Sequence, residues 1–164
     1  MLSIIIPAYN EELSVERAYY TISEILEKAQ IDNEIIFIDD GSTDTTYKKI
    51  ENLADKEKNI YGLHFSRNFG KEAAISAGLA SAKGDAVVVI DCDLQHPPEK
   101  IVEMYHLWQE GYEIVEGIKK TRGKESKMHG FAARKFYRVI SSVVGFDMSN
   151  ASDFKLLDRK VVDI

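Results

Sequence analysis

A single cysteine, three prolines and the lack of any long apolar run set the first limits on this 164-residue chain. As the sole cysteine, Cys92 cannot form an internal disulfide, which favours a reducing compartment. No stretch approaches the roughly 20 apolar residues of a membrane span, so we expect the chain itself to be soluble. Basic residues are in the minority, 21 against 27 acidic ones, and the net charge of −6 disfavours bulk electrostatic binding of nucleic acid.

The composition is otherwise that of an ordinary globular protein, with 45% apolar and 29% charged residues. These fractions exclude disorder as the dominant state. The length suits one domain, and we expect residues 1–164 to form it. Residues 159–164 look like the opening of a helix, so we expect the chain to be C-terminally truncated.

Positive charge is concentrated in residues 119–138, which hold eight Lys or Arg residues and one acid, Glu125. Two interpretations stay open. Such a segment can form a solvated face of the protein. It can also bind an anionic partner, either phosphate groups or the anionic surface of a membrane.

Short β-branched runs alternate with longer stretches of helical periodicity along the whole chain. Strands that are apolar on both faces and alternate with helices indicate a mostly parallel sheet covered on both sides. The pattern therefore predicts an α/β fold. Strands are predicted at 3–7, 34–38, 60–65, 86–90, 112–117 and 153–157, and helices at 13–30, 47–54, 71–82, from Pro97 to Gly111, and 131–144.

Three of the predicted strands end in polar residues suited to a binding site. These are residues 7–11 (PAYNE), 39–44 (DDGSTD) and 91–96 (DCDLQH). Acidic residues after a strand often only cap the next helix, as Asp44 or Thr43 could do here. However, open parallel sheets bind ligands outside the carboxyl ends of their strands. Three acidic groups on one edge indicate a cation or a set of hydrogen-bond donors, because crowded carboxylates repel.

The pair Asp91 and Asp93, directly after an apolar strand, is the sharpest of these features. Two such carboxylates offer hard oxygen ligands to Mg²⁺ or Mn²⁺, which commonly share them with substrate phosphates. Cys92 between them fits a small residue that points away from the metal. The absence of a Cys/His cluster disfavours zinc. His96 is a candidate third ligand, or it caps the next helix or contacts substrate.

Other known phosphate-binding and catalytic motifs are missing. No GxGxxG follows a strand, and Gly70-Lys71 is followed by Glu72 rather than Ser or Thr, which excludes a P-loop. There is no GxSxG nucleophile elbow. A phospho-acceptor signalling domain would carry its acidic pair after the first strand and a lone Asp after the third, where this chain has FSR at 65–67.

With these motifs the chain resembles the inverting nucleotide-sugar glycosyltransferases of family 2. Among them it is most similar to dolichol-phosphate mannose synthases and bacterial polyprenyl-phosphate glycosyltransferases. The resemblance implies the GT-A fold, a Rossmann-like three-layer α/β sandwich with a mostly parallel central sheet. The matching motifs span nearly the whole chain in the family's order: 4–12 (IIIPAYNEE), 38–44 (IDDGSTD), 66–72 (SRNFGKE), 91–99 (DCDLQHPPE) and 152–159 (SDFKLLDR).

The resemblance also implies a reaction and its residues. A hexose would pass with inversion from a UDP- or GDP-sugar to a polyprenyl phosphate at the cytoplasmic face of the membrane. Mg²⁺ or Mn²⁺ would neutralise the departing nucleoside diphosphate. The implied metal ligands are Asp91 and Asp93, and the implied catalytic residue is Asp153. The implied nucleotide-binding positions are Pro7, Tyr9, Glu11, Ile38, Asp40, Asp91, Cys92, Gln95 and Lys119.

Several alternatives remain at this point. Lys119 stands where many relatives have Arg, and a point charge replaces a bidentate fork, so that phosphate contact is an open question. Tyr9 either stacks on the base or belongs to the core. The acceptor is a polyprenyl phosphate, or a saccharide or other hydroxyl compound. A non-catalytic nucleotide-sugar-binding module and a homo-oligomer are further alternatives.

Overall fold

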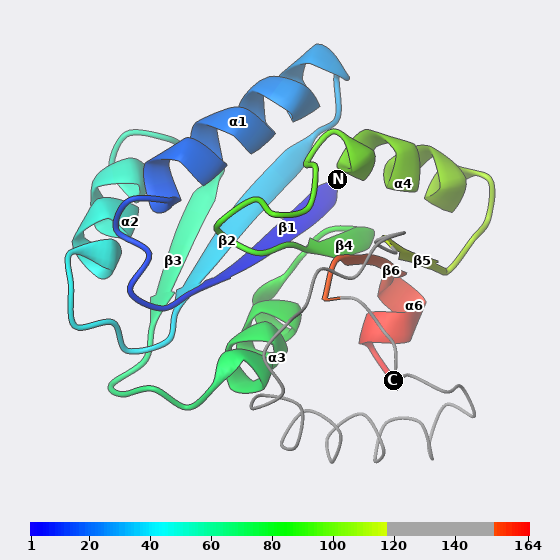
Figure 1. The fold of residues 1–164 in the computed structure, drawn as a ribbon. Coiled ribbons are helices and arrows are strands. Elements are labelled where there is room, and N and C mark those ends of the chain that lie inside the picture. Colours follow the sequence, from blue (N-terminus) through cyan, green and yellow to red (C-terminus); the bar gives the residue numbers. More distant parts are fainter. Residues whose placement is uncertain (118–152) are drawn as a thin grey trace.

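A computed structural model describes residues 1–117 and 153–164 of the chain. Its centre is a six-stranded sheet of order β3-β2-β1-β4-β6-β5 (Figure 1). The first four strands in this order are mutually parallel, and β6 is antiparallel to both β4 and β5. The strands are β1 (Leu2–Ala8), β2 (Asn33–Asp39), β3 (Ile60–His64), β4 (Ala86–Val89), β5 (Ile114–Glu116) and β6 (Lys155–Asp158).

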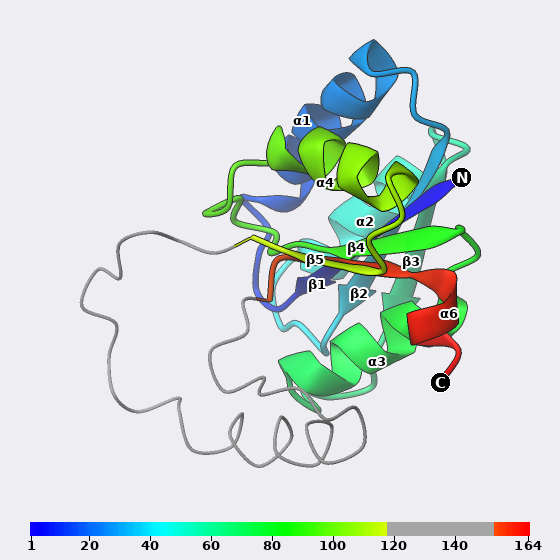
Figure 2. The same ribbon diagram turned by 90° about the vertical axis from the view of Figure 1, so that its right-hand side faces the viewer.

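Helices cover both faces of the sheet, so the predicted three-layer arrangement is confirmed. Figure 1 and Figure 2 show α1, α2 and α4 on one side and α3 and α6 on the other. The helices are α1 (Val15–Lys28), α2 (Thr46–Ala54), α3 (Lys71–Ser81), α4 (Lys100–Gln109) and α6 (Arg159–Val162). In the part of the chain that the structure describes, none of them is long and apolar enough to cross a bilayer.

Strand alternation divides the apolar residues between two cores. Successive side chains of a strand point to opposite faces, so Ile4 and Ile6 pack under α1 while Ile5 packs against α3. Phe37 and Ile38 of β2 divide in the same way. Because β1, β2 and β4 are buried on both faces, they form a rigid base for the loops that follow them.

Helix α3 approaches the sheet closely, as its alanine-rich sequence predicts. A Cβ added to Gly78 would lie 2.6 Å from Cγ2 of Ile5 and 2.8 Å from Cδ1 of Ile38, two fully buried side chains. We expect Gly78→Val to destabilise the fold by about 1–3 kcal/mol, because the core must shift to accept the methyl groups. Urea unfolding measures this, with Ala80→Val at an exposed position of α3 as the control. Equal losses in both variants would contradict close packing at Gly78.

Three sequence predictions need correction. Strand β3 is an edge strand rather than one apolar on both faces, and Tyr61 on it is 46% exposed. The first helix begins at Val15, two residues later than predicted, because the amide of Ser14 turns back to the carbonyl of Glu11. The last strand begins at Lys155, which leaves Asp153 in the preceding loop. The helix predicted at 131–144 lies outside the described residues.

Candidate functional site

Asp91 and Asp153 lie at the same edge of the sheet, although 62 positions separate them in the numbering. Val89, the last residue of β4, pairs with Lys155, the first residue of the antiparallel β6. Asp91 follows Val89 by two residues and Asp153 precedes Lys155 by two. The register therefore brings both carboxylates to the carboxyl edge of the parallel strands, where open α/β sheets bind ligands.

Lys71 joins these two carboxylates. Its Nζ lies 2.6 Å from Oδ1 of Asp91 and 2.7 Å from Oδ2 of Asp153. All three side chains are partly exposed, between 30% and 39%. Burial lowers the pKa of Lys71, but the charges and hydrogen bonds of the two aspartates outweigh it, so the pKa is raised above its ordinary value. Lys71 is therefore a stable cation between the two acids.

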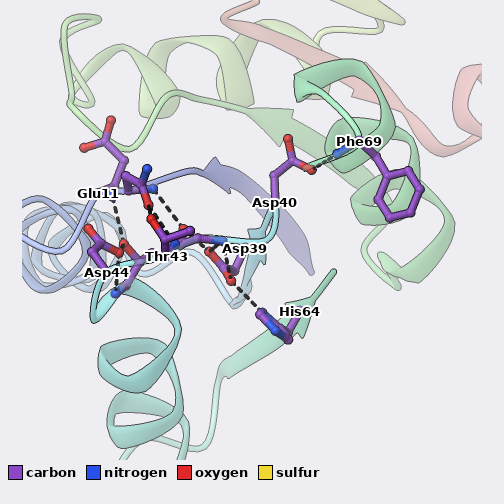
Figure 3. Close-up of polar contacts among 10 residues, drawn as sticks. Glu11, Asp39, Asp40, Thr43, Asp44, His64 and Phe69 are labelled. Carbon is purple, nitrogen blue, oxygen red and sulfur yellow. Dashed lines mark hydrogen bonds and ion pairs between the residues drawn. The ribbon is translucent and has the colours of Figure 1, made fainter. Parts of the chain in front are cut away.

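Asp40 fixes the backbone from which Lys71 extends. One carboxylate oxygen accepts a hydrogen bond from the amide of Phe69 at 2.7 Å (Figure 3). The other accepts one from the amide of Gly70 at 2.9 Å. Gly70 has a φ of +99°, which a residue with a side chain rarely adopts, and α3 starts directly after it at Lys71. The end of β2 is thus tied to the start of α3, and the position of the Lys71 backbone follows from this link.

The loops that follow β1 and β2 are fastened to each other. Asn10, with a φ of +54°, donates its amide to Oγ of Ser42, and its Oδ1 accepts from the amide of Thr43 at 2.9 Å. Its neighbours make matching bonds with residues 44–46: the amides of Glu11 and Glu12 donate to Thr46 and Asp44, and the Glu12 carboxylate accepts from Thr45. The two loops therefore behave as one preformed unit.

The N-cap of α2 is Thr45, not Asp44 or Thr43 as expected, and the Thr45 side chain makes no capping hydrogen bond. Asp44 lies one residue earlier, and its Oδ1 accepts from the amide of Thr46, the first residue of the helix, at 2.9 Å. Burial opposes the charge, but hydrogen bonds from Thr46 and from the amide of Glu12 outweigh it, so the pKa of Asp44 is lowered. The carboxylate of Glu11 points away from Thr43 and Asp44 in Figure 3. Glu11 is therefore oriented toward the outside of this loop pair.

A buried aspartate, Asp39, links this loop pair to a histidine of the neighbouring strand, His64. Asp39, fully buried at the end of β2, lies opposite His64 of β3, and its Oδ2 is 2.6 Å from Nδ1 of His64. Asp39 also accepts from the amide and the hydroxyl of Ser42. The His64 ring stacks on Tyr47 of α2, with centroids 4.2 Å apart. Asp39 thus couples strand β3 to the loop that holds Asn10.

Removing the imidazole should cost stability. We expect His64→Leu to lower the free energy of unfolding by about 1–3 kcal/mol, because Oδ2 of the buried Asp39 loses its short bond and keeps only the longer one from the Ser42 amide, at 3.4 Å, while the apolar contact with Tyr47 persists. Urea denaturation measures the loss. His106→Leu is the matched control, since His106 is exposed on α4, where its ring lies 3.3 Å from the Gln109 side chain and edge-on to Tyr105 of the same helix. A loss no greater than that of the control would contradict a stabilising role for this pair.

The loop after β4 holds the two predicted metal ligands in different settings. Asp91 contacts Lys71, whereas Oδ1 of Asp93 accepts from the amide of Gln95 at 3.0 Å. Leu94, between Asp93 and Gln95, has a φ of +57°, an uncommon value for a residue with a side chain. Arg17 of α1 donates to the carbonyl of Asp93 at 3.2 Å. This loop is held in a specific conformation from both sides.

Within residues 1–117 and 153–164, no group of three or more His, Cys, Asp or Glu side chains is arranged to hold a metal ion. His96 packs its ring on Phe154, with centroids 5.1 Å apart. Two partly exposed carboxylates nevertheless suit Mg²⁺ or Mn²⁺, which often take one or two protein carboxylates and complete their shell with water and substrate phosphates. The donor set of Asp91 and Asp93 fits such an ion on these terms.

The remaining predicted site residues that the structure describes fall into two groups. Tyr9 and Gln95 are exposed at the rim, where side chains can reach a ligand. Pro7, Ile38 and Cys92 are buried, and the side chains of Ile38 and Cys92 belong to the two cores. Burial raises the pKa of the Cys92 thiol to about 12, which makes it unreactive at neutral pH. Lys119, together with the basic segment 119–138, lies outside the described residues.

Sequence reasoning missed three contributors: Lys71, Asn10 and the pair of Asp39 with His64. Lys71 could have been suspected from its place at a helix start after the motif 66–70, since that segment follows a strand at the same edge. Asp39 and His64 could have been paired by aligning the ends of two adjacent parallel strands. Nothing in the local sequence indicates that Asn10 reaches Thr43.

Comparison with known proteins agrees with this geometry. The model of the family Glycosyl transferase family 2 matches residues 3–162. An uncharacterized glycosyltransferase of Synechocystis sp. is 44% identical over 163 residues, covering 99% of this chain and 51% of the relative. The bactoprenol glucosyl transferase of Shigella phage SfV is 37% identical over 163 residues, covering 99% and 53%. The chain thus spans about half the length of the curated relatives it matches.

Solved structures show the same fold. A mannosyltransferase of Pyrobaculum calidifontis, in complex with GDP-Man and Mn²⁺, has a TM-score of 0.68 at 20% identity, covering 99% of this chain and 45% of that one. Glucosyl-3-phosphoglycerate synthase of Mycobacterium tuberculosis, with Mn²⁺, UDP-Glc and phosphoglyceric acid, has a TM-score of 0.64 at 27% identity, covering 98% and 57%. These neighbours confirm the expected GT-A fold. Because the family model matches nearly the whole of this chain, the chain belongs to glycosyl transferase family 2.

Proposed function

We propose that this chain carries the catalytic centre for metal-dependent transfer of a hexose from a UDP- or GDP-sugar, with inversion, to a polyprenyl phosphate. The observation that carries the proposal is that Asp91 and Asp153 both form ion pairs with the ammonium group of Lys71, at the carboxyl edge of the sheet. Such an arrangement would bring a predicted metal ligand, Asp91, and the predicted catalytic residue, Asp153, to one reaction centre.

The donor would lie along the rim from β2 to β4. Tyr9 and Glu11 would contact the base and ribose, and the bonds between the loops after β1 and β2 support this by fixing the backbone beside both residues. Asp40 contributes by fixing the start of α3, since both of its oxygens already bind backbone amides. Pro7, Ile38 and Cys92 would shape the floor of this region rather than reach the ligand through polar groups. Gln95 and Lys119 are proposed contacts of the diphosphate.

Asp91 and Asp93 would hold Mg²⁺ or Mn²⁺ together with the donor diphosphate. The bound ion would supply Lewis-acid stabilisation of the negative charge on the departing nucleoside diphosphate. The related synthase of M. tuberculosis, at 27% identity, was solved with Mn²⁺ and UDP-Glc, which supports this part of the proposal. Attack from the face of the sugar opposite the leaving group gives inversion.

The names of the sequence relatives support the lipid acceptor. The bactoprenol glucosyl transferases match 99% of this chain at 37% identity. An acceptor of this kind places the reaction at a membrane surface, and we propose its cytoplasmic face, with segment 119–138 as a contact for anionic groups. One observation favours a hydroxyl acceptor as the second candidate: the M. tuberculosis synthase was solved in complex with phosphoglyceric acid as well as UDP-Glc.

A product analysis distinguishes these acceptors. The intact protein is incubated with Mn²⁺, a panel of UDP- and GDP-hexoses, and either a short-chain prenyl phosphate or phosphoglyceric acid. We expect a glycosyl prenyl phosphate of inverted anomeric configuration, identified by NMR. Exclusive transfer to the hydroxyl acceptor would replace the proposed acceptor with the second candidate. Sugar-nucleotide binding without any transfer would indicate a non-catalytic module.

A further inference from the structure

We propose that Lys71 is a positioning residue whose contact with Asp91 is replaced by the divalent ion when the donor binds. Lys71 then keeps its ion pair with Asp153 and donates the released N–H to the acceptor phosphate. The inference rests on the proposed function, because it assumes a metal-bound donor and a phosphate acceptor. It extends that function by assigning the place of Lys71 in the order of binding.

Lys71 and the divalent ion compete for the carboxylate of Asp91. The Lys71 ammonium lies 2.6 Å from Oδ1 of Asp91, within direct contact distance. A divalent ion also needs the lone pairs of this carboxylate, and it would repel an ammonium in the same place. Lys71 and the metal ion are therefore alternative cations for Asp91, and binding of one weakens binding of the other.

After the exchange, the Lys71 side chain stays close to Asp153. Its backbone begins α3 and is fixed by the bonds of Asp40 to the amides of Phe69 and Gly70. Only the side chain can move, and the bond of 2.7 Å to Asp153 keeps it at the reaction centre. An ammonium has three N–H donors, so loss of Asp91 releases at least one of them for a new acceptor of hydrogen bonds.

Asp153 tolerates a phosphate nearby because Lys71 carries the opposite charge. A carboxylate beside an anionic acceptor is repulsive unless a cation lies between or next to them. Lys71 is such a cation, and its Nζ forms an ion pair with Oδ2 of Asp153 at 2.7 Å. Asp153 is then required chiefly to hold Lys71 in place, and the phosphate is bound by the ammonium.

Mn²⁺ binding without nucleotide tests the competition. Electron paramagnetic resonance of free Mn²⁺ gives the affinity of the intact wild-type protein and of Lys71→Met and Lys71→Gln, two variants that remove the charge in different ways. We expect Mn²⁺ to bind about fivefold or more tightly to both variants, the lower end of typical coupling between two ligands. Thermal unfolding checks that each variant is folded.

Lys155→Met is the matched control. Lys155 follows Asp153 by two residues, and burial lowers the pKa of its ammonium, with Glu116 and Asp153 acting in the opposite direction. Its replacement removes the same charge beside Asp153 but leaves the bond of Lys71 to Asp91 intact. We expect Mn²⁺ affinity to change less than about twofold in this control. An equal gain in Lys155→Met and Lys71→Met would show a general charge effect and overturn the proposal.

Binding of a short-chain prenyl phosphate tests the second half. In the wild type, saturation with Mn²⁺ and UDP should tighten binding of the prenyl phosphate about fivefold or more, because the exchange releases Lys71. In Lys71→Met this gain should vanish. An unchanged gain, or unchanged Mn²⁺ affinity in both Lys71 variants, overturns the inference while leaving the proposed function in place. If no variant binds Mn²⁺ with or without UDP, the metal part of the proposed function and this inference both fail.

Discussion

Asp91→Asn should reduce the rate of sugar transfer by about 100-fold or more, although it replaces only one carboxylate oxygen with an amide nitrogen. The ion held at Asp91 and Asp93 would offset charge on the departing diphosphate, a stabilisation of several kcal/mol, and each 1.36 kcal/mol of barrier corresponds to a tenfold change in rate. An amide oxygen is a weaker ligand than a carboxylate, so binding of the nucleoside diphosphate should also lose its dependence on Mn²⁺.

Calorimetry with UDP and with GDP, each with and without Mn²⁺, measures this loss directly. Asp32→Asn is the control, because Asp32 is an exposed aspartate at the opposite, amino edge of the sheet, directly before β2. The control removes the same charge and should leave Mn²⁺ dependence unchanged. Unchanged nucleotide affinity and unchanged Mn²⁺ dependence in both Asp91→Asn and Asp93→Asn would exclude these residues as the metal site.

The layers and the binding edge could be predicted from the sequence because they depend on local patterns. Short, continuous β-branched runs mark β1, β2 and β4, and helical periodicity marks α1, so the α/β class follows from residue order alone. The polar groups at 7–11, 39–44 and 91–96 each follow a strand, and parallel strands must end at one edge. The predicted edge is therefore a consequence of topology rather than of any long-range contact.

What could not be predicted depends on register and on distant pairs. The contact of Lys71 with both Asp91 and Asp153 requires the antiparallel pairing of β6 with β4, which no local pattern specifies. The exposure of β3 depends on its place at the sheet edge, a property of strand order and not of its own residues. Side-chain orientation is a further limit: Ile38 and Asp40 are two residues apart, yet one lies in a core and the other binds amides.

Asp153→Asn should lower the transfer rate by about 10- to 100-fold without removing any step of the pH profile. Near neutral pH a phosphate monoester is mostly dianionic, with a second pKa of about 6, and is already nucleophilic. Asp153 then has little proton to remove. Its bond of 2.7 Å to Lys71 gives it another task, to hold a cation near the acceptor, and misplacement of about 1 Å at a reaction centre can cost 100-fold.

The pH–rate profile of wild type and Asp153→Asn with a short-chain prenyl phosphate decides between the two roles. Protonation of the acceptor itself should make both rates fall below about pH 6, so this acidic limb should persist in the variant. A general base must be deprotonated to act and contributes about 10²- to 10⁴-fold, as a hydroxyl acceptor would require. If the acidic limb of the wild type vanishes in Asp153→Asn and the loss reaches several orders of magnitude, Asp153 is a true base, and the phosphate acceptor loses its chemical support.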